Sequence, residues 1–420
     1  MSVTDLASTA LIAGALMAGG TALISALPVP EKSLVRTSFL LTFAVSLTLL
    51  VTYWNVSAFW GGGRQGFSYS DDETYHLQGV QMAAAGTVED TESRNPGFTE
   101  WTAFLYRIFG PNTLNVRIFN IFFRCLWTLP VAFLALTCNN HHCTRLAIML
   151  TAWAPSSILV SLLHIKDLLA GLAFLCALAA IVYLGRSRLS ILVLVCSAWM
   201  LWIVRKDILL LLGVLIFLKA LISLRRGANA AALTTLAAVA LLIWFAIPIL
   251  MDNWVLISGN ESSVTNQIFE YTSQNAASAH GLAPFFITSA GQIWKLPAAM
   301  AVALLLPFPP DLHSGDIMLT ALGLASIFVL LLMPFAAVGC VRLIETKKEA
   351  GLPIYGGFLG CLALLTLVFL GTPRYRESLM GLYCLLAAVG ITERRSHPHL
   401  LAGSIFCACI VLVVGAATFV

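Results

Sequence analysis

Charged residues are scarce in this sequence. They make up 10% of its 420 residues, against 59% hydrophobic residues and a mean hydropathy of +0.89. A soluble domain carries about 25% charged residues, so the composition excludes an ordinary soluble protein and predicts a polytopic membrane protein. The net charge of +4 is therefore no signal of a nucleic-acid partner. In a membrane protein it is read loop by loop, as a signal of topology.

Several motifs are also missing. The sequence has no P-loop, no dinucleotide fingerprint and no internal repeat, so nothing in it indicates ATP-driven transport or a nicotinamide cofactor. The two long polar segments, 54–115 and 252–295, contain none of the ten cysteines, which predicts no disulfide framework. No basic region precedes the first apolar run, Leu6 to Leu27, so we expect that run to be a membrane span rather than a signal peptide.

Apolar runs separated by charged residues predict membrane helices. We expect an all-α fold, with one integral membrane domain over residues 1–420 and about 12 transmembrane helices. A further apolar run, Leu296 to Pro309, is bracketed by prolines and predicts a re-entrant or broken helix. The predicted spans are 6–27, 34–53, 115–137, 146–163, 168–184, 191–204, 208–222, 230–250, 316–341, 354–371, 378–391 and 400–419.

Lysines and arginines set the predicted orientation. The short connections on one side of the predicted bundle hold eleven basic residues and only four acidic ones, and such loops mark the cytoplasmic side. Both termini and both long polar segments are then expected on the outer face, and a bacterial inner membrane is the first expectation. The basic connections are 28–33, 138–145, 185–190, 223–229, 342–353 and 392–399.

The most polar stretch is Ser70-Asp71-Asp72-Glu73-Thr74-Tyr75-His76, in the first outer segment. Ser70 followed by Glu73 fits a capping box, and acids in the first turn of a helix complement its dipole. That interpretation explains Glu73 better than it explains the adjacent Asp71 and Asp72. We therefore predict that one of these two aspartates is the general base of a membrane enzyme.

Three groups of basic residues at outer span ends run against the bias for positive charge inside. They are Lys166-Asp167, Arg205-Lys206-Asp207 and Arg374-Tyr375-Arg376-Glu377. Each base has an acid beside it, so local pairing or snorkelling is one explanation. Because all three groups share the face of the acidic run, the pattern favours a cationic site that binds a phosphate.

Each outer segment has its own predicted organisation. In 54–115 we expect a helix over about 71–85 and a second helix that begins at Asn95-Pro96 and ends at Gly110. The apolar residues of the second helix recur at helical spacing, which favours an amphipathic helix in the membrane interface over one packed in a core. The segment 252–295 is long enough to form a flap over a site. The apolar residues are Phe98, Trp101, Phe104, Leu105, Ile108 and Phe109.

Seven short motifs follow one another between residues 54 and 390. They are Asp71-Asp72-Glu73-Thr74-Tyr75, Asn95-Pro96-Gly97, Phe109-Gly110-Pro111, Arg117-Ile118-Phe119-Asn120, Ala154-Pro155-Ser156, Lys166-Asp167 and Arg374-Tyr375-Arg376. In this order they resemble the GT-C membrane glycosyltransferases, which include aminoarabinose transferases, protein O-mannosyltransferases and bacterial polysaccharide-assembly enzymes. The acidic motif is the most specific of the seven, and the lysine and arginine motifs gain weight only from the order.

The resemblance implies a transferase that takes a sugar from a polyprenyl-phosphate-linked donor on the periplasmic or lumenal face. The acceptor would be a hydroxyl of a glycan, lipid or protein, usually with inversion, and membrane lipids are the surrounding partners. Asp71 or Asp72 would be the base. Candidates for the phosphate are Lys166, Arg205, Lys206, Arg374 and Arg376, of which we expect two or three to touch it. Other candidate substrate-binding residues are Glu73, Tyr75, His76, Asp167 and Tyr375, with Arg107 and Arg117 as secondary candidates.

Some features leave alternatives open. Two spans rather than one precede the acidic loop, the two adjacent aspartates do not reveal which one is catalytic, and the superfamily has both metal-dependent and metal-independent members. The alternative functions are a transporter or flippase for lipid-linked glycans and an O-antigen-type polymerase. Arg124 is the only clear charge deep in a predicted span, which disfavours transport, and few arginines in the outer segments disfavour the polymerase. A structural membrane subunit is the remaining option.

Overall fold

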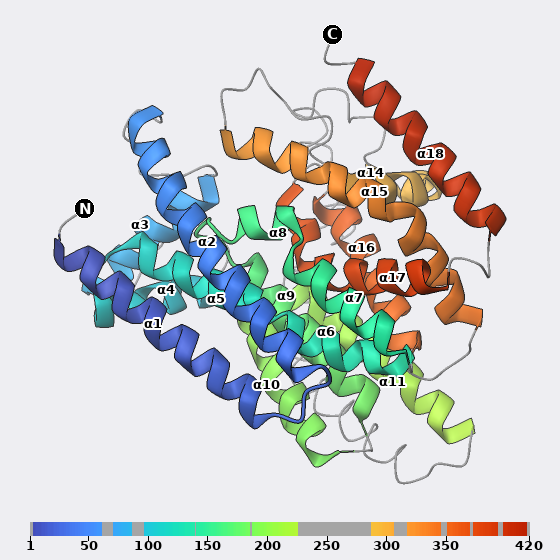
Figure 1. The fold of residues 1–420 in the computed structure, drawn as a ribbon, viewed down its shortest axis with the longest axis horizontal. Helices are drawn as coiled ribbons and strands as arrows, with labels where there is room; N and C mark the ends of the chain where they lie inside the picture. Colours follow the sequence, from blue (N-terminus) through green and yellow to red (C-terminus); the bar gives the residue numbers. More distant parts are fainter. Residues whose placement is uncertain are drawn as a thin grey trace, which may run out of the picture.

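The computed structural model describes residues 3–60, 70–85, 96–138, 140–184, 187–225, 287–305, 317–345, 351–369, 373–393 and 398–417. All regular elements in these ranges are helices, and no strand occurs among them, which confirms the all-α prediction (Figure 1). The predicted span at 230–250 and most of the predicted flap, up to residue 286, lie outside the described residues.

The helices follow the predicted runs closely. The first part comprises α1 Val3–Ala26, α2 Lys32–Trp60, α3 Ser70–Ala85, α4 Pro96–Phe109, α5 Thr113–Cys125, α6 Thr128–Ala135, η1 Leu136–Cys138, α7 His141–Ala152, α8 Pro155–Val160, α9 Asp167–Tyr183, α10 Arg188–Val204 and α11 Lys206–Arg225. The second part comprises η3 Ala290–Lys295, α14 Leu296–Leu305, α15 Ile317–Glu345, α16 Gly351–Phe369, η4 Pro373–Leu379, α17 Met380–Thr392 and α18 Pro398–Ala417.

Four stretches of the described chain are long and apolar enough to cross a membrane: Ala7–Ala26, Lys32–Ser57, Thr113–Cys138 and Ile317–Glu345. Shorter apolar helices, such as Asp167–Tyr183 and Arg188–Val204, pack among them. These are the helices of an integral membrane protein. The predicted count of about 12 spans is not confirmed.

The run predicted as one span at 146–163 forms two helices instead. The helix α7 ends at Ala152, and α8 starts at Pro155. A proline has no backbone N–H to donate into the preceding turn and its ring clashes there, so the helix breaks and restarts with Pro155 at its first position. This break brings the irregular backbone of 161–166 to the same end of the bundle as α3.

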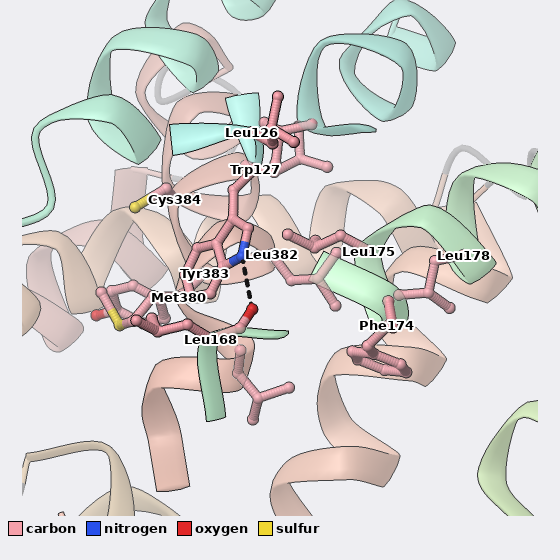
Figure 2. Close-up of a cluster of buried hydrophobic side chains, with 14 of the residues drawn as sticks. Leu126, Trp127, Leu168, Phe174, Leu175, Leu178, Met380, Leu382, Tyr383 and Cys384 are labelled. Carbon is pink, nitrogen blue, oxygen red and sulfur yellow. Dashed lines mark hydrogen bonds between the residues drawn. The ribbon is translucent and has the colours of Figure 1, made fainter. Parts of the chain in front are cut away.

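The core lies where α5, α6, α9 and α17 meet. Figure 2 shows Trp127, between α5 and α6, with its indole N–H directed at the backbone carbonyl of Leu168 on α9, at a distance of 3.1 Å. Leu175 on α9 and Tyr383 on α17 are buried in the same cluster. A buried tryptophan needs a hydrogen-bond acceptor for its N–H, so this contact fixes the start of α9 against the core.

Two pairs of the connections predicted on the cytoplasmic side lie side by side in the structure. At one end, Arg145 donates to Glu31 at 2.9 Å, so the connections 28–33 and 138–145 lie side by side. Arg342 lies 3.5 Å from Glu393 and brings 342–353 next to 392–399. The connections predicted on the outer face meet in a separate set of contacts, around α3 and α9. The cytoplasmic assignment of the first end stays a prediction from its positive charge.

The apolar stripe of α4 does not face one environment, which corrects the prediction of a purely interfacial helix. Phe98 and Leu105 are buried against α3 and the bundle, whereas Phe104 and Ile108 are 51% and 55% exposed. A close approach to α10 explains the burial, because a Cβ on Gly97 would lie 2.6 Å from the carbonyl oxygen of Ile203. Only a glycine fits there. The start and end of α4, at Pro96 and before Gly110 with φ +82°, are confirmed.

Candidate functional site

The acidic run forms the first turn of α3, where the backbone N–H groups favour negative charge. The three carboxylates differ in exposure: Asp72 is fully buried, Asp71 is half-buried and Glu73 is exposed. Successive side chains of a helix point about 100° apart. Two adjacent aspartates therefore point in different directions, and here Asp72 is the one that faces the protein interior.

Arg117 and the backbone of His164 are among the groups that contact the carboxylate of Asp72. The backbone N–H of His164 donates to Oδ1 at 2.9 Å, and the guanidinium Nη2 of Arg117 lies 3.6 Å from Oδ2. Arg117 is also fully buried, and its guanidinium lies 5.5 Å from the ring centroid of Trp54 on α2, a cation–π distance. Asp72 thus ties the start of α3 to α5 and to the connection between α8 and α9.

His164 contacts both α3 and α4, which the sequence did not predict. Its side chain is fully buried, its Nε2 lies 3.0 Å from Thr102 Oγ1 on α4, and its ring packs 5.7 Å from the ring of Phe98. The available signal was its position two residues before Lys166-Asp167. Arg117, a secondary candidate from the sequence, had a clearer signal, because it precedes Asn120 and Arg124 at helical spacing.

Tyr75 and His76, two predicted substrate contacts, lie in different surroundings. Tyr75 is buried, and its ring meets Phe98 edge-on with centroids 5.0 Å apart. His76 is half-buried, and its Nδ1 lies 2.8 Å from the hydroxyl of Tyr106 on α4. The structure therefore places Tyr75 in the core between α3 and α4 and leaves His76 nearer the surface.

Burial lowers the pKa of His76 and the pKa of His164, and the positive charge of Arg117 lowers each of them further. The pKa of His164 is well below its usual value near 6.5, so its imidazole is neutral at pH 7. Because the pKa of an unfolded histidine is near 6.5, the unfolded chain binds protons below that pH which the folded chain excludes. The free energy of unfolding therefore falls as the pH drops below about 6.5.

We expect the melting temperature to fall between pH 7 and pH 5, with His164 contributing up to about 1.4 kcal/mol per pH unit. Thermal unfolding in nanodiscs at several pH values measures this effect. A His164→Asn variant should show a shallower pH dependence, whereas His142→Asn, which changes an exposed histidine on α7, should keep the wild-type slope. Equal slopes in wild type and His164→Asn would contradict the prediction.

Lys166-Asp167 marks the start of α9, and Asp167 is buried in an ion pair. Arg205 Nη2 lies 2.5 Å from Asp167 Oδ1, and Arg205 Nη1 lies 3.5 Å from Asp207 Oδ2. The hydroxyl of Ser378 donates to the backbone carbonyl of Asp167 at 3.2 Å. Arg205 is only 3% exposed, so its guanidinium joins α9 to the junction of α10 and α11. Its neighbour Lys206 is exposed and lies 5.0 Å from the ring of Trp202.

The Arg374-Tyr375-Arg376 motif forms part of η4, and Arg376 is bound internally. Its Nε donates to Glu377 at 3.0 Å, its Nη1 to the Leu304 carbonyl at 2.8 Å and its Nη2 to the Ser326 hydroxyl at 3.0 Å. The hydroxyls of Ser156 and Ser157 on α8 donate to Glu377 Oε2 at 3.1 and 2.8 Å. The side chains of Arg374 and Tyr375 lie outside the described part of the chain.

The connection 161–166 and the start of α9 contain or contact three of the predicted site residues, Asp72, Asp167 and Arg205. His164 in this connection contacts Asp72, and Lys166 and Asp167 at its end lead to Arg205 and to η4. The structure brings the acidic run and the basic motifs to one end of the bundle. In the described residues, no group of three His, Cys, Asp or Glu side chains is arranged to hold a metal ion.

No protein-family model matches the chain, and the comparison with curated proteins found no match. Solved structures with a similar arrangement of helices include the two that follow. The first is the archaeal oligosaccharyltransferase AglB from Archaeoglobus fulgidus in complex with an inhibitory peptide and a dolichol-phosphate, with 12% identity and a TM-score of 0.46 over 88% of this chain and 54% of that chain. The second is the apo form of the Archaeoglobus fulgidus oligosaccharyltransferase, with 12% identity, a TM-score of 0.44 and the same coverage.

Both neighbours are named as oligosaccharyltransferases. The chain spans about half the length of each of them.

Proposed function

We propose that this chain is a membrane glycosyltransferase that moves a sugar from a polyprenyl-phosphate-linked donor to a hydroxyl of a glycan, lipid or protein at the outer face. The observation that carries the proposal is the unequal burial of the two aspartates at the start of α3. Asp72 is fully buried against Arg117 and the His164 N–H, and Asp71 is half-buried beside it. A general base must reach the proton that it removes, so we assign that role to Asp71.

The reaction needs one proton transfer and one substitution. The acceptor hydroxyl attacks the anomeric carbon of the donor sugar and gives its proton to the carboxylate of Asp71. The bond between the anomeric carbon and the phosphate oxygen breaks, and polyprenyl phosphate leaves with the electron pair. Attack opposite the leaving phosphate inverts the anomeric centre. Some members of the resembled superfamily use a divalent metal, but no step of this proposal involves one.

The negative charge of the leaving phosphate requires fixed cations. Arg205 and Arg376 are both buried, at 3% exposure, and each forms an ion pair with a carboxylate of the protein itself. We therefore assign them to positioning. Lys206, which is exposed beside Trp202 at the start of α11, is the cation that we assign to the phosphate, whereas Lys166, which precedes α9, is itself buried at 8% exposure.

The assay follows release of polyprenyl phosphate from a panel of polyprenyl-phosphate sugars by the protein in nanodiscs, with a crude acceptor fraction present. Lys206→Ala is expected to raise KM for the lipid donor about tenfold, the effect of losing one charge-assisted hydrogen bond. Its kcat should change little, because this contact is made in the bound donor and in the transition state alike. Lys32→Ala, which removes an exposed lysine from the connection predicted on the opposite face, is the matched control and should leave KM unchanged.

Two results would overturn the proposal. One is the failure of wild type to release lipid phosphate from any donor of the panel, together with equal binding of polyprenyl phosphate by wild type and Lys206→Ala. The other is turnover that survives in Asp71→Asn at the wild-type rate, which overturns the assignment of the base to Asp71 while the transferase itself stands. Release by wild type that is lost in Asp71→Asn supports the transferase and the role of Asp71 together.

A further inference from the structure

One face of α5 carries three polar side chains that are buried almost completely. Arg117, Asn120 and Arg124 recur at spacings of three and four residues, which puts them on the same side of the helix, and they are 0%, 0% and 1% exposed. Polar and charged groups inside an apolar bundle are costly and persist where they meet specific partners. The partners here are a carboxylate and four backbone carbonyls.

The C-terminal end of this face, at Arg124, contacts the break between α7 and α8. In an unbroken helix the carbonyl of Thr151 would accept from the N–H of residue 155, but Pro155 has none. The guanidinium Nη2 of Arg124 takes that place, 3.2 Å from the Thr151 carbonyl and 3.4 Å from the Ala154 carbonyl. Irregular backbone within a membrane protein needs such partners, so Arg124 accounts for the tolerance of the break.

The middle of this face, at Asn120, contacts the connection 161–166. The amide Nδ2 of Asn120 donates to the carbonyl of Leu163 at 2.8 Å and to the carbonyl of Ile165 at 2.9 Å. The residue between these two carbonyls is His164, whose N–H donates to Asp72, and the residue after them is Lys166. Both hydrogens of one amide thus fix the backbone on each side of the group that holds Asp72.

We propose that Asn120 is a positioning residue of the glycosyltransferase site. By clamping the carbonyls of Leu163 and Ile165, it sets the direction of the His164 N–H toward Asp72 and the start of α9 at Lys166. Arg117 on the same helix face holds Asp72 from the other side. The inference rests on the proposed function for its catalytic consequence, but the clamp itself is a structural claim that can be measured without any substrate.

Hydrogen–deuterium exchange of the 161–166 segment tests the clamp. Asn120→Leu keeps the approximate side-chain size and removes both donor hydrogens, and it should speed exchange of this segment by at least about tenfold, as expected for the loss of two hydrogen bonds. The matched control is Asn115→Leu on the same helix. Asn115 is also fully buried, and its Oδ1 accepts from Thr9 on α1 rather than from the 161–166 segment. Exchange of 161–166 should stay at the wild-type rate in this control.

Turnover separates positioning from simple stability. Asn120→Leu is expected to lower kcat about 100-fold, the effect of a displacement near 1 Å at a catalytic group, whereas Asn115→Leu should lower the melting temperature with kcat unchanged. If Asn120→Leu does not fold, Asn120→Asp provides a second variant of the same shape that sets an oxygen against the two carbonyls and should speed the same exchange. If exchange of 161–166 in Asn120→Gln is as slow as in wild type, that result would support a role for the donated hydrogens.

The outcomes for the clamp and for the proposed function can be told apart. Equal exchange of 161–166 in wild type and the Asn120 variants, or equal acceleration in Asn115→Leu, overturns the clamp whether or not the protein turns over a donor. Accelerated exchange with no turnover by wild type on any donor supports the clamp and counts against the proposed function. Turnover by wild type with the same kcat in Asn120→Leu overturns the catalytic consequence alone.

Discussion

Asp71→Asn is expected to lower kcat for release of polyprenyl phosphate by about 100- to 10,000-fold, the usual contribution of a general base. Asparagine keeps the shape of the side chain but cannot take the proton of the acceptor hydroxyl. Because Asp71 is half-buried, the free energy of unfolding should change by no more than about 0.5 kcal/mol, as for most substitutions near a surface. Steady-state kinetics in nanodiscs, with thermal unfolding of the same samples, measures both quantities.

Two neighbouring acids provide the comparison. Glu73→Gln changes an exposed carboxylate two residues away and should retain most of the turnover, so general loss of negative charge in this turn is controlled. Asp72→Asn should lose stability together with turnover, since its carboxylate is held by Arg117 and His164. A variant Asp72→Asn that folds with wild-type stability and has no turnover would transfer the role of base to Asp72.

The helices were accessible from the sequence because apolar runs and their boundaries are local properties. The start of α4 at Pro96 and its end before Gly110 needed only capping rules. The break at Pro155 was visible too, but the apolar run on both sides of it favoured one span. The apolar run could not indicate that Arg124, a buried arginine on another helix, donates to the carbonyl of Thr151 in place of the missing N–H.

The sequence predicted candidate residues but not their roles. Asp72 came from the acidic run, and Asp167, Arg205 and Arg376 came from charges at the ends of predicted spans. In the structure the His164 N–H of the 161–166 connection donates to Asp72, and Asp167 pairs with Arg205. The sequence could not separate residues that bind each other from residues available to a ligand. That distinction depends on which way each side chain points, as in Arg205, which is buried on Asp167, and Lys206, which is exposed.

The role of His164 could not be predicted from the sequence, for a different reason. Its contribution to Asp72 comes from its backbone N–H rather than from its imidazole, and a backbone donor leaves no mark in the residue type. Arg117 did carry a signal, because an arginine, an asparagine and a second arginine at helical spacing in an apolar run require buried partners. Which carboxylate Arg117 would meet depended on where the start of α3 lies relative to α5, and the resulting ion pair joins residues 45 positions apart.

Removal of the Asp72 carboxylate is expected to destabilise the protein strongly. Asp72→Ala takes away the counter-charge that lies 3.6 Å from the buried guanidinium of Arg117, and breaking a buried ion pair from one side costs about 3–5 kcal/mol. The variant should therefore unfold at a clearly lower temperature, in nanodiscs and at neutral pH. Glu100→Ala is the matched control, because Glu100 is an exposed acid on α4, and it should leave the melting temperature close to that of wild type.

The cost should depend on Arg117, and a double-mutant cycle measures that dependence. Arg117→Met removes the charge and keeps an unbranched side chain beside Trp54, so Asp72→Ala in that background no longer leaves this guanidinium without its counter-charge. We expect the loss from Asp72→Ala to shrink by more than about 1.5 kcal/mol in the Arg117→Met background. Equal losses in the two backgrounds would mean that Asp72 does not stabilise the protein through its ion pair with Arg117, and would overturn this prediction.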